Sequence, residues 1–159
     1  TEGARAIADT LFGKYNPSGK LPMSFPYCVG QVPVHYNEYS TGRPHVEGKD
    51  KDRFRSKYLD IPNEPLYPFG YGLSYTTFEV SDIHLDRTWM DTSGQIEAEV
   101  TVKNTGNCTG TETLQLYIHD IAASVVRPVR ELKDFKKVTL RPGEEKKVVF
   151  TITEQQLLF

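Results

Sequence analysis

The sequence has little cysteine, no long apolar run and no excess of charge of one sign. Its 159 residues include 2 cysteines, and 19 basic and 21 acidic residues give a formal net charge of -2. No apolar run reaches the roughly 18 residues of a membrane-spanning helix. The balanced charge gives no reason to expect a nucleic-acid partner. With 38% hydrophobic residues, the composition is that of one ordinary globular domain, or of a small domain with an extended arm.

Cysteine and histidine offer no metal or redox motif. Cys28 and Cys108 fit neither a CxxC pair nor a zinc pattern, and whether they form a disulfide stays open because connectivity cannot be read from spacing. The four histidines show no spacing typical of metal ligands, so neither a metal nor another cofactor is expected. They are His35, His45, His84 and His119.

A short amphipathic helix opens the sequence. Its apolar residues recur at i, i+3, i+4 and i+7, and Gly13 stands where a left-handed C-cap is expected. These apolar residues are Ala4, Ile7, Ala8 and Leu11. So short a helix depends on packing of its apolar face, since nucleation is costly. No later segment has the helical period needed to cover that face, so we expect its partner to precede Thr1.

Residues 14–78 have almost no regular periodicity and are rich in proline and aromatic side chains. An irregular connection of this length is uncommon inside a compact domain. A free linker would leave the aromatic rings in water, where their apolar area is not buried. We therefore predict an arm that lies along a larger body.

Apolar and polar residues alternate, as is typical of β-strands, in the part of the sequence that follows the arm. Ile96, Ala98, Val100 and Val102 alternate with polar residues, which predicts a half-buried strand. The same alternation recurs over residues 113–119 and again at Val148, Phe150 and Ile152, with turn signals at Asn104-Thr105-Gly106 and Arg141-Pro142-Gly143. Between these segments, apolar residues follow a weaker period. They are Leu132, Phe135, Val138 and Leu140.

Short strands at this spacing predict a mainly β fold, an immunoglobulin-like or fibronectin type III-like β-sandwich preceded by a helix and an irregular arm. About five strands are found where such a sandwich needs about seven. We therefore expect the sandwich to be incomplete, with its closing strands beyond Phe159.

Several blocks of the sequence resemble glycoside hydrolase family 3, in the order of that family. The run GKYNPSGKLPMSFP at 13–26 resembles the end of the family's second domain, and PLYPFGYGLSYTTF at 65–78 resembles the segment that leads into its fibronectin type III-like domain. Four further segments of this chain resemble the body of that domain: VKNTG at 102–106, QLY at 115–117, the segment 124–128 and ELKDF at 131–135.

The resemblance implies a division of the chain and of the chemistry. Residues 1–26 would be the tail end of an α/β sandwich domain, 27–77 a connecting arm, and 78–159 a truncated fibronectin type III-like sandwich. The parent would be a β-glucosidase-type exo-hydrolase, periplasmic or extracellular, that acts with retention on oligo- or aryl-glycosides. Its catalytic Asp and Glu would lie on upstream domains of the same polypeptide, so this portion is expected to brace those domains and to be inactive alone.

No carboxylate pair in this chain is a persuasive substitute for the missing ones. Retaining glycosidases hold two carboxyl groups about 5–5.5 Å apart. The nearest candidates lie in a mixed-charge loop, on the solvent face of a strand and in a turn, where charged side chains are normally solvated. They are Asp50 with Asp52, Glu97 with Glu99, and Glu144 with Glu145.

The arm holds the candidates for contact with substrate: Tyr36, Tyr39, Arg43 and His45. The resemblance implies that this loop runs near the catalytic domains, where an aromatic ring or a guanidinium could border a sugar. Docking of the arm accounts for the same residues, because aromatic burial alone explains them, and is the favoured interpretation.

An alternative hypothesis is a carbohydrate-binding or adhesion sandwich without catalysis. Such sugar-binding sandwiches present a row of exposed aromatic residues, and here only Tyr117 and Trp89 qualify. That hypothesis also leaves the arm and the opening helix without a purpose.

Overall fold

The chain separates into two compact units. The computed structural model describes residues 2–46, 48 and 53–158. One unit, here the sandwich unit, comprises Thr1–Gly19, Gly72–Leu116 and Lys133–Phe159. The other, here the loop unit, comprises Lys20–Tyr71 and Tyr117–Leu132.

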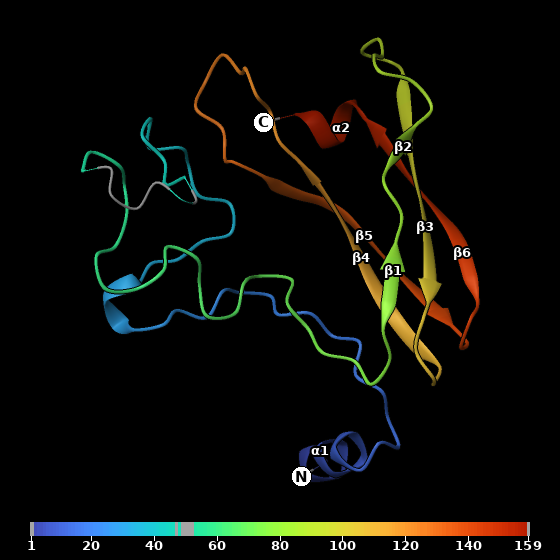
Figure 1. Ribbon diagram of the computed structural model, residues 1–159. Helices are drawn as coiled ribbons and strands as arrows, with labels where there is room; N and C mark the ends of the chain where they lie inside the picture. The colour runs from blue at the N-terminus through green and yellow to red at the C-terminus, as the bar shows by residue number, and fades with distance from the viewer. Residues whose placement is uncertain (1, 47, 49–52, 159) are drawn as a thin grey trace. The chain divides into compact units, whose positions relative to one another are not determined.

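Two sheets make up the β-structure of the described residues (Figure 1). The first contains β1 (Phe78–Val80), β2 (His84–Leu85), β3 (Gln95–Asn104) and β6 (Glu145–Thr153). The second contains β4 (Gly110–Ile118) and β5 (Glu131–Leu140). These described strands are fewer than the roughly seven of a complete immunoglobulin-like sandwich, as the sequence predicted.

The central strand of the first sheet is β3. Strand β6 pairs antiparallel along it, from Gln95 opposite Thr153 to Lys103 opposite Glu145. Strands β1 and β2 are also antiparallel to β3 and pair with separate stretches of it, which places them on its other edge. The strand predicted from alternation at residues 95–103 is thereby confirmed.

One apolar core lies between the sheets. Ala98 and Val102 of β3 have no exposed surface, and Leu140 of β5 is only 1% exposed. The core cluster draws residues from both sheets, namely Ala98, Val102, Leu114, Leu116, Val138, Leu140, Val148 and Phe150. Burial of each large aliphatic or aromatic side chain contributes about 1.5–3 kcal/mol. The two sheets therefore pack as the β-sandwich that the sequence predicted.

The apolar residues of β5 alternate only weakly with polar ones, and the structure of the strand explains why. Val138 and Leu140 point into the core, two residues apart, whereas Phe135 has the opposite parity and is 60% exposed. An apolar residue on each face of one strand blurs the alternation, so the pattern marks apolar positions here without defining a clear strand.

A buried asparagine closes the end of β3. The Asn104 side chain donates to the carbonyls of Cys108 and Leu140 at 2.9 and 3.0 Å. Its Oδ1 accepts from Thr76 Oγ1 at 2.7 Å and from the Gly106 backbone N–H at 3.0 Å. A Cβ at Gly106 would collide with Thr76 Oγ1 and with the backbone of Thr77, so the turn that follows β3 requires glycine.

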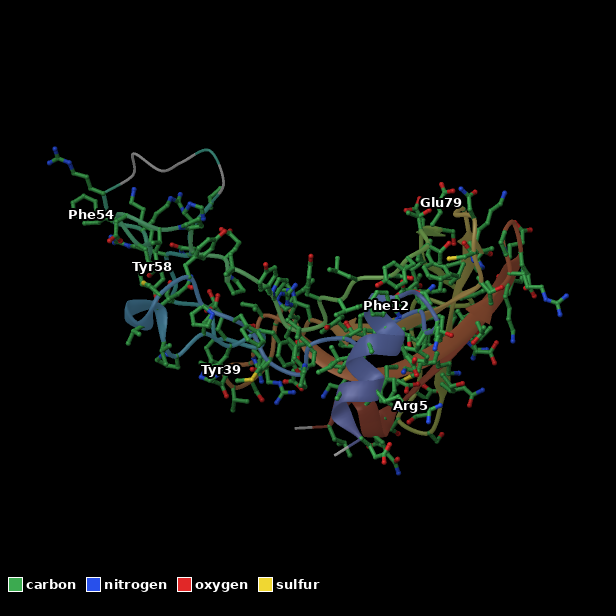
Figure 2. All side chains as sticks on the ribbon, turned by 90° about the horizontal axis from the view of Figure 1, so that it is seen from below. Arg5, Phe12, Tyr39, Phe54, Tyr58 and Glu79 are labelled. Atoms are coloured by element: carbon green, nitrogen blue, oxygen red, sulfur yellow. The ribbon has the colours of Figure 1, made fainter. Side chains whose placement is uncertain are left out.

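The predicted opening helix is α1 (Gly3–Leu11), and Gly13 has the expected positive φ of 75°. Its apolar face is open, since Ile7 and Leu11 are 63% and 71% exposed. Figure 2 labels Arg5 near its start and Phe12 at its C-cap. No described helix is long and apolar enough to cross a membrane.

Asn16 ties the segment after α1 to the rest of the sandwich unit. Its Oδ1 accepts from Ser74 Oγ and from the Tyr75 backbone N–H at 3.0 and 2.9 Å, and its Nδ2 donates to the Thr109 carbonyl at 3.1 Å. The Tyr75 hydroxyl donates to the carbonyl of Thr10 at 2.8 Å. At the other end of the chain, α2 (Glu154–Leu157) is a single turn that begins with a capping box between Thr153 and Gln156.

Candidate functional site

The loop unit is organised around one buried amide, Gln31, at the end of the 3-10 turn η1 (Val29–Gln31). Gln31 is 1% exposed, and its Oε1 accepts from the Tyr27 backbone N–H at 2.8 Å. Its Nε2 lies 3.1, 3.3 and 3.1 Å from the carbonyl oxygens of Pro62, Asn63 and Glu64. One side chain thus joins two irregular segments that share no described strand.

A second amide folds the neighbouring loop. Asn63 accepts from the Tyr58 backbone N–H and donates to the Ser56 carbonyl, both at 2.9 Å. Ser56 in turn donates through its backbone N–H to the Arg43 carbonyl and through its hydroxyl to Thr41 Oγ1, again at 2.9 Å. These bonds hold the segments 41–44 and 55–64 in place without a regular ladder.

Tyr36 is the centre of an aromatic cluster. Its ring stacks on Phe69 with centroids 4.1 Å apart and meets Tyr117 edge-on at 6.0 Å. The Tyr36 carbonyl accepts from Arg130 Nε at 3.3 Å, and its hydroxyl accepts from the Leu132 backbone N–H at 3.4 Å. The ring and both oxygens are thus engaged within the chain, so the geometry assigns Tyr36 to holding the loop unit together.

Burial raises the pKa of Tyr117, against an opposing effect from Arg130, whose guanidinium carbon lies 5.8 Å from the centre of the Tyr117 ring. Tyr117 is therefore part of the cluster and does not stand in a row of exposed aromatic residues. Trp89, by contrast, is 70% exposed.

A cavity of about 470 Å³ lies in the loop unit and brings together three of the four candidates. Tyr36, Tyr39 and His45 line it, with His45 half-buried and Tyr39 60% exposed. Tyr39 is fixed by an antiparallel bridge to Pro128, and Arg130 lines the same cavity. Figure 2 shows the Tyr39 and Tyr58 side chains on this part of the chain.

Arg43 lies at a separate hollow of about 400 Å³, which also involves Arg53, Phe54 and Arg55. Phe54 is 77% exposed and is labelled in Figure 2, and Arg55 Nη1 donates to the Pro44 carbonyl at 3.0 Å. Arg43 is exposed, and its guanidinium makes no hydrogen bond or ion pair within the part of the chain that the structure describes. The structure thus separates Arg43 from the other three candidates.

The sequence did not single out Arg130, Phe54 or Gln31 for this region. Arg130 lies in a basic segment of the chain, yet it contacts Tyr36 across 94 residues. No local pattern connects the two, because the pairing is made by the tertiary fold.

Each described pair of carboxylates weighed as catalytic contains one with a structural partner, and the third pair lies outside the described residues. Glu99 of β3 pairs with Lys147 of β6 at 2.8 Å, which raises the pKa of Lys147. Glu144 accepts from the backbone N–H of Arg141 at 2.7 Å in the turn before β6. Asp50 and Asp52 fall outside the residues that the structure describes. The described geometry offers no case for a catalytic pair.

Among the described residues, no group of His, Cys, Asp and Glu side chains is placed to hold a metal ion. Cys28 and Cys108 are both free thiols and both exposed. Cys108 Sγ donates to the Tyr75 carbonyl at 3.4 Å, which places it among the contacts around Asn16.

Two family profiles match the chain. The one described as the glycosyl hydrolase family 3 C-terminal domain matches residues 1–75, and the one described as the fibronectin type III-like domain matches residues 112–159. The first profile runs through both the opening helix and most of the irregular segment, and the second covers β5, β6 and most of β4.

Relatives and solved structures agree with these profiles. The chain is 54% identical over 159 residues to the periplasmic beta-glucosidase of Salmonella typhimurium, covering 100% of this chain and 21% of that protein. It is 45% identical over 157 residues to a putative beta-xylosidase of Formosa agariphila, covering 99% and 19%. The crystal structure of a beta-glucosidase from Listeria innocua in complex with isofagomine is 49% identical and superimposes with a TM-score of 0.90, covering 98% of this chain and 22% of that one.

The sandwich, the irregular loop unit and these matches define the class: a C-terminal portion of the glycosyl hydrolase type that includes a fibronectin type III-like sandwich. More specifically, the chain belongs to glycoside hydrolase family 3 and corresponds to the C-terminal part of its β-glucosidase-type members. It spans about a fifth of the length of the curated relatives that it matches.

Proposed function

We propose that the whole protein is a retaining, exo-acting β-glucosidase-type hydrolase, and that this chain braces its catalytic domains without supplying the catalytic carboxylates. The likeness to the Listeria innocua beta-glucosidase carries the proposal, because it extends over 98% of the chain at 49% identity. In a retaining mechanism one carboxylate attacks the anomeric carbon and a second one protonates the leaving oxygen. Glu99 and Glu144 are engaged in contacts within the chain, which supports placing both catalytic carboxylates on the rest of the polypeptide.

The proposed organisation keeps the boundaries expected from the sequence. Residues 1–26 are the tail end of an α/β sandwich domain, 27–77 are a connecting arm, and 78–159 form the fibronectin type III-like sandwich. The open apolar face of α1 supports the first assignment, since Ile7 and Leu11 are exposed here. The match of one family profile to residues 1–75 supports treating the helix and arm as one functional stretch.

Hydrolysis of an aryl β-glucoside tests the proposal directly. The whole protein should release the aryl group with retention at the anomeric carbon, observed by NMR of the first sugar formed. Purified residues 1–159 should show no turnover above buffer. Turnover by the fragment, or none by the whole protein, would contradict the proposed division of labour.

A second candidate activity is β-xylosidase, favoured by the relatives from Formosa agariphila that carry this name. The ratio of kcat/KM for aryl β-glucoside to that for aryl β-xyloside distinguishes the two. We propose glucose as the preferred sugar, so a ratio below one would favour the xylosidase.

Among the substrate-side candidates, we propose that Tyr36 braces the loop unit and that Arg43 docks the arm onto the rest of the polypeptide. Tyr36 uses its ring and both oxygens in contacts within the chain, whereas the Arg43 side chain is exposed. Arg43→Ala in the whole protein should lower the melting temperature more than it changes KM. A large rise in KM with an unchanged melting temperature would instead favour contact of Arg43 with a sugar. For Tyr39 and His45, which share a cavity with Tyr36, the same pair of measurements separates the two roles.

We also propose a periplasmic location, which the name of the Salmonella typhimurium relative supports. Release of the activity by osmotic shock of the native host, without a cytosolic marker, would support it. Retention with the cytosolic marker would argue against it.

A further inference from the structure

The connection between β2 and β3 in the sandwich unit is a loop held at both ends (Figure 1). The Asp86 backbone N–H donates to the Glu97 carbonyl at 3.0 Å, and the Glu97 backbone N–H donates to Asp86 Oδ1 at 2.7 Å. Arg87 Nε donates to the other oxygen of Asp86 at 2.9 Å. The base of the loop is therefore fixed by an ionic and hydrogen-bonded cluster.

Residues 90–94 of the loop are also held by a hydrogen bond and by close packing. Gly94 donates through its backbone N–H to the Asp91 carbonyl at 2.8 Å, which closes a turn. A Cβ at Gly94 would lie 3.1 Å from the Asp91 carbonyl oxygen and 3.2 Å from the Cβ of Met90. A side chain here would thus press on the turn that holds Met90 and Asp91. A loop fixed in this way loses little conformational entropy when a ligand binds.

This loop presents the only tryptophan of the chain to solvent. Trp89 is 70% exposed and lines a hollow of about 280 Å³, which Asp86, Arg87, Met90, Asp91 and Gly94 also line. Drug-sized ligands occupy cavities of roughly 300–1,000 Å³. A hollow just below that range suits a single ring.

Several polar groups of the residues that line this hollow have no partner in the described part of the chain. No hydrogen bond or ion pair among the described residues engages the Trp89 indole N–H, the Asp91 carboxylate or the two NH2 groups of Arg87. The hollow thus combines an apolar aromatic face with both donors and acceptors. A pyranose ring has the matching chemistry, because its C–H face is apolar and its edge carries hydroxyls that donate and accept.

We propose that the loop 86–94 is a surface binding site for one pyranose unit of a β-glucan, with Trp89 stacked on the sugar face and Arg87 and Asp91 hydrogen-bonded to its hydroxyls. The choice of a β-glucan as the polymer rests on the proposed function. The site would hold a polymer near the enzyme while the catalytic domains act on chain ends. It adds a binding role to the sandwich of a hydrolase and needs no row of aromatic residues.

Affinity electrophoresis of the whole protein in gels containing laminarin tests the site, with hydrolysis of an aryl β-glucoside measured on the same samples. Trp89→Ala should weaken retention about three- to tenfold, as expected for loss of one aromatic contact, while Trp89→Phe keeps most of it. Phe135→Ala removes another exposed aromatic residue of the sandwich unit and is the matched control, with no expected change. Aryl-glucoside turnover should be the same in all variants.

Two results would overturn the site: no retention of the unmodified protein by laminarin, or equal retention of Trp89→Ala. A lower melting temperature together with lower aryl-glucoside turnover in Trp89→Ala would also overturn it, because Trp89 would then be covered by another part of the protein. The site and the proposed activity can fail separately. Retention that depends on Trp89 without any aryl-glucoside hydrolysis would support the site and contradict the activity.

Discussion

Each unit of this chain contains a fully buried side-chain amide, but the surroundings of the two amides differ. Asn104 of the sandwich unit has no exposed surface, and Gln31 of the loop unit is 1% exposed. Asn104 ends a strand that is paired with β6 along its length and packed on an apolar core. Gln31 joins irregular segments that are otherwise connected only by isolated contacts, such as the antiparallel bridge between Phe25 and Tyr67.

The chain therefore satisfies its backbone groups in two ways. In the sandwich unit, the sheets pair the backbone donors and acceptors of the strands, and the Asn104 amide bonds groups at the end of β3. In the loop unit, backbone bonds occur only at isolated positions such as the Phe25–Tyr67 bridge, and side-chain amides and hydroxyls supplement them. The same kind of substitution should produce a global loss of stability in the first unit and a local opening in the second.

Removal of a core side chain from the sandwich should have the largest effect. Phe150 of β6 is 4% exposed and lies in the core cluster, so Phe150→Ala should lower the free energy of unfolding by about 3–5 kcal/mol. Phe135→Ala, at a position that is 60% exposed, should change it by about 0.5 kcal/mol or less. Urea unfolding measures both variants, and equal losses would contradict the assignment of the core.

Asn104→Leu should have the next largest effect. It would leave the Cys108 and Leu140 carbonyls, the Thr76 hydroxyl and the Gly106 N–H without their partner. An unsatisfied buried group costs about 1–3 kcal/mol, so we expect a loss of about 2–3 kcal/mol that is seen with every probe of the sandwich.

The control for Asn104 is Asn107→Leu, an exposed amide in the turn that follows the same strand. Its urea midpoint should match that of the unmodified protein. If Asn104→Leu unfolded with an unchanged midpoint, water would have to replace the four hydrogen bonds. The Asn104 amide would then not stabilise the end of β3.

Gln31→Leu should have a smaller and local effect. The variant leaves the Tyr27 N–H and the carbonyls at 62–64 unpaired, whereas the bridge between Phe25 and Tyr67 still connects the neighbouring segments. We expect about 1–2 kcal/mol of local destabilisation. Hydrogen exchange should accelerate at residues 56–64 and remain unchanged in β3 and β6.

Gln155→Leu, at an exposed position of α2, provides the matched control. Exchange in the loop unit should not respond to it. A uniform acceleration over both units in Gln31→Leu would mean that the loop unit and the sandwich open together, which would remove the difference between the two units.

The sandwich was predictable because its signals are local. A strand with one buried face alternates in sequence, and β3, β4 and β6 all do so. The opening helix was predictable for the same reason, from its apolar spacing and from Gly13. Strand β5 was harder to predict, because Phe135 faces away from the core and interrupts the alternation of apolar and polar residues.

The candidate site was less predictable because long-range contacts build it. The sequence proposed Tyr36, Tyr39, Arg43 and His45 as neighbours in one loop, and the structure groups three of them but not Arg43. Arg130 joins the same cavity from a distant segment. Asn104 continues the alternation of Ala98 and Val102 onto the core face of β3, but nothing in composition or period marks Gln31 as buried. Amides are normally exposed, and the three-dimensional partners explain the burial of both.

The smallest expected effect concerns the charge that anchors the loop after β2. The Glu97 backbone N–H donates to the Asp86 carboxylate, with a further contribution from Arg87, and this lowers the pKa of Asp86 below its ordinary value of 3.8. A lowered pKa in the folded state means that the folded protein favours the ionised carboxylate. The stabilisation is therefore fully present above pH 3.8 and is lost as the pH falls through the lower folded-state value.

Asp86→Asn should slightly lower the melting temperature at pH 7, and the difference from the unmodified protein should narrow as the pH falls below 3.8. Asp82→Asn, which changes an exposed carboxylate in the segment before β2, should show no such convergence. Melting temperatures measured between pH 2 and pH 7 test both variants. A difference that stays constant down to acid pH would mean that a neutral amide at position 86 accepts the Glu97 N–H as well as the carboxylate does, and that charge adds nothing to this anchor.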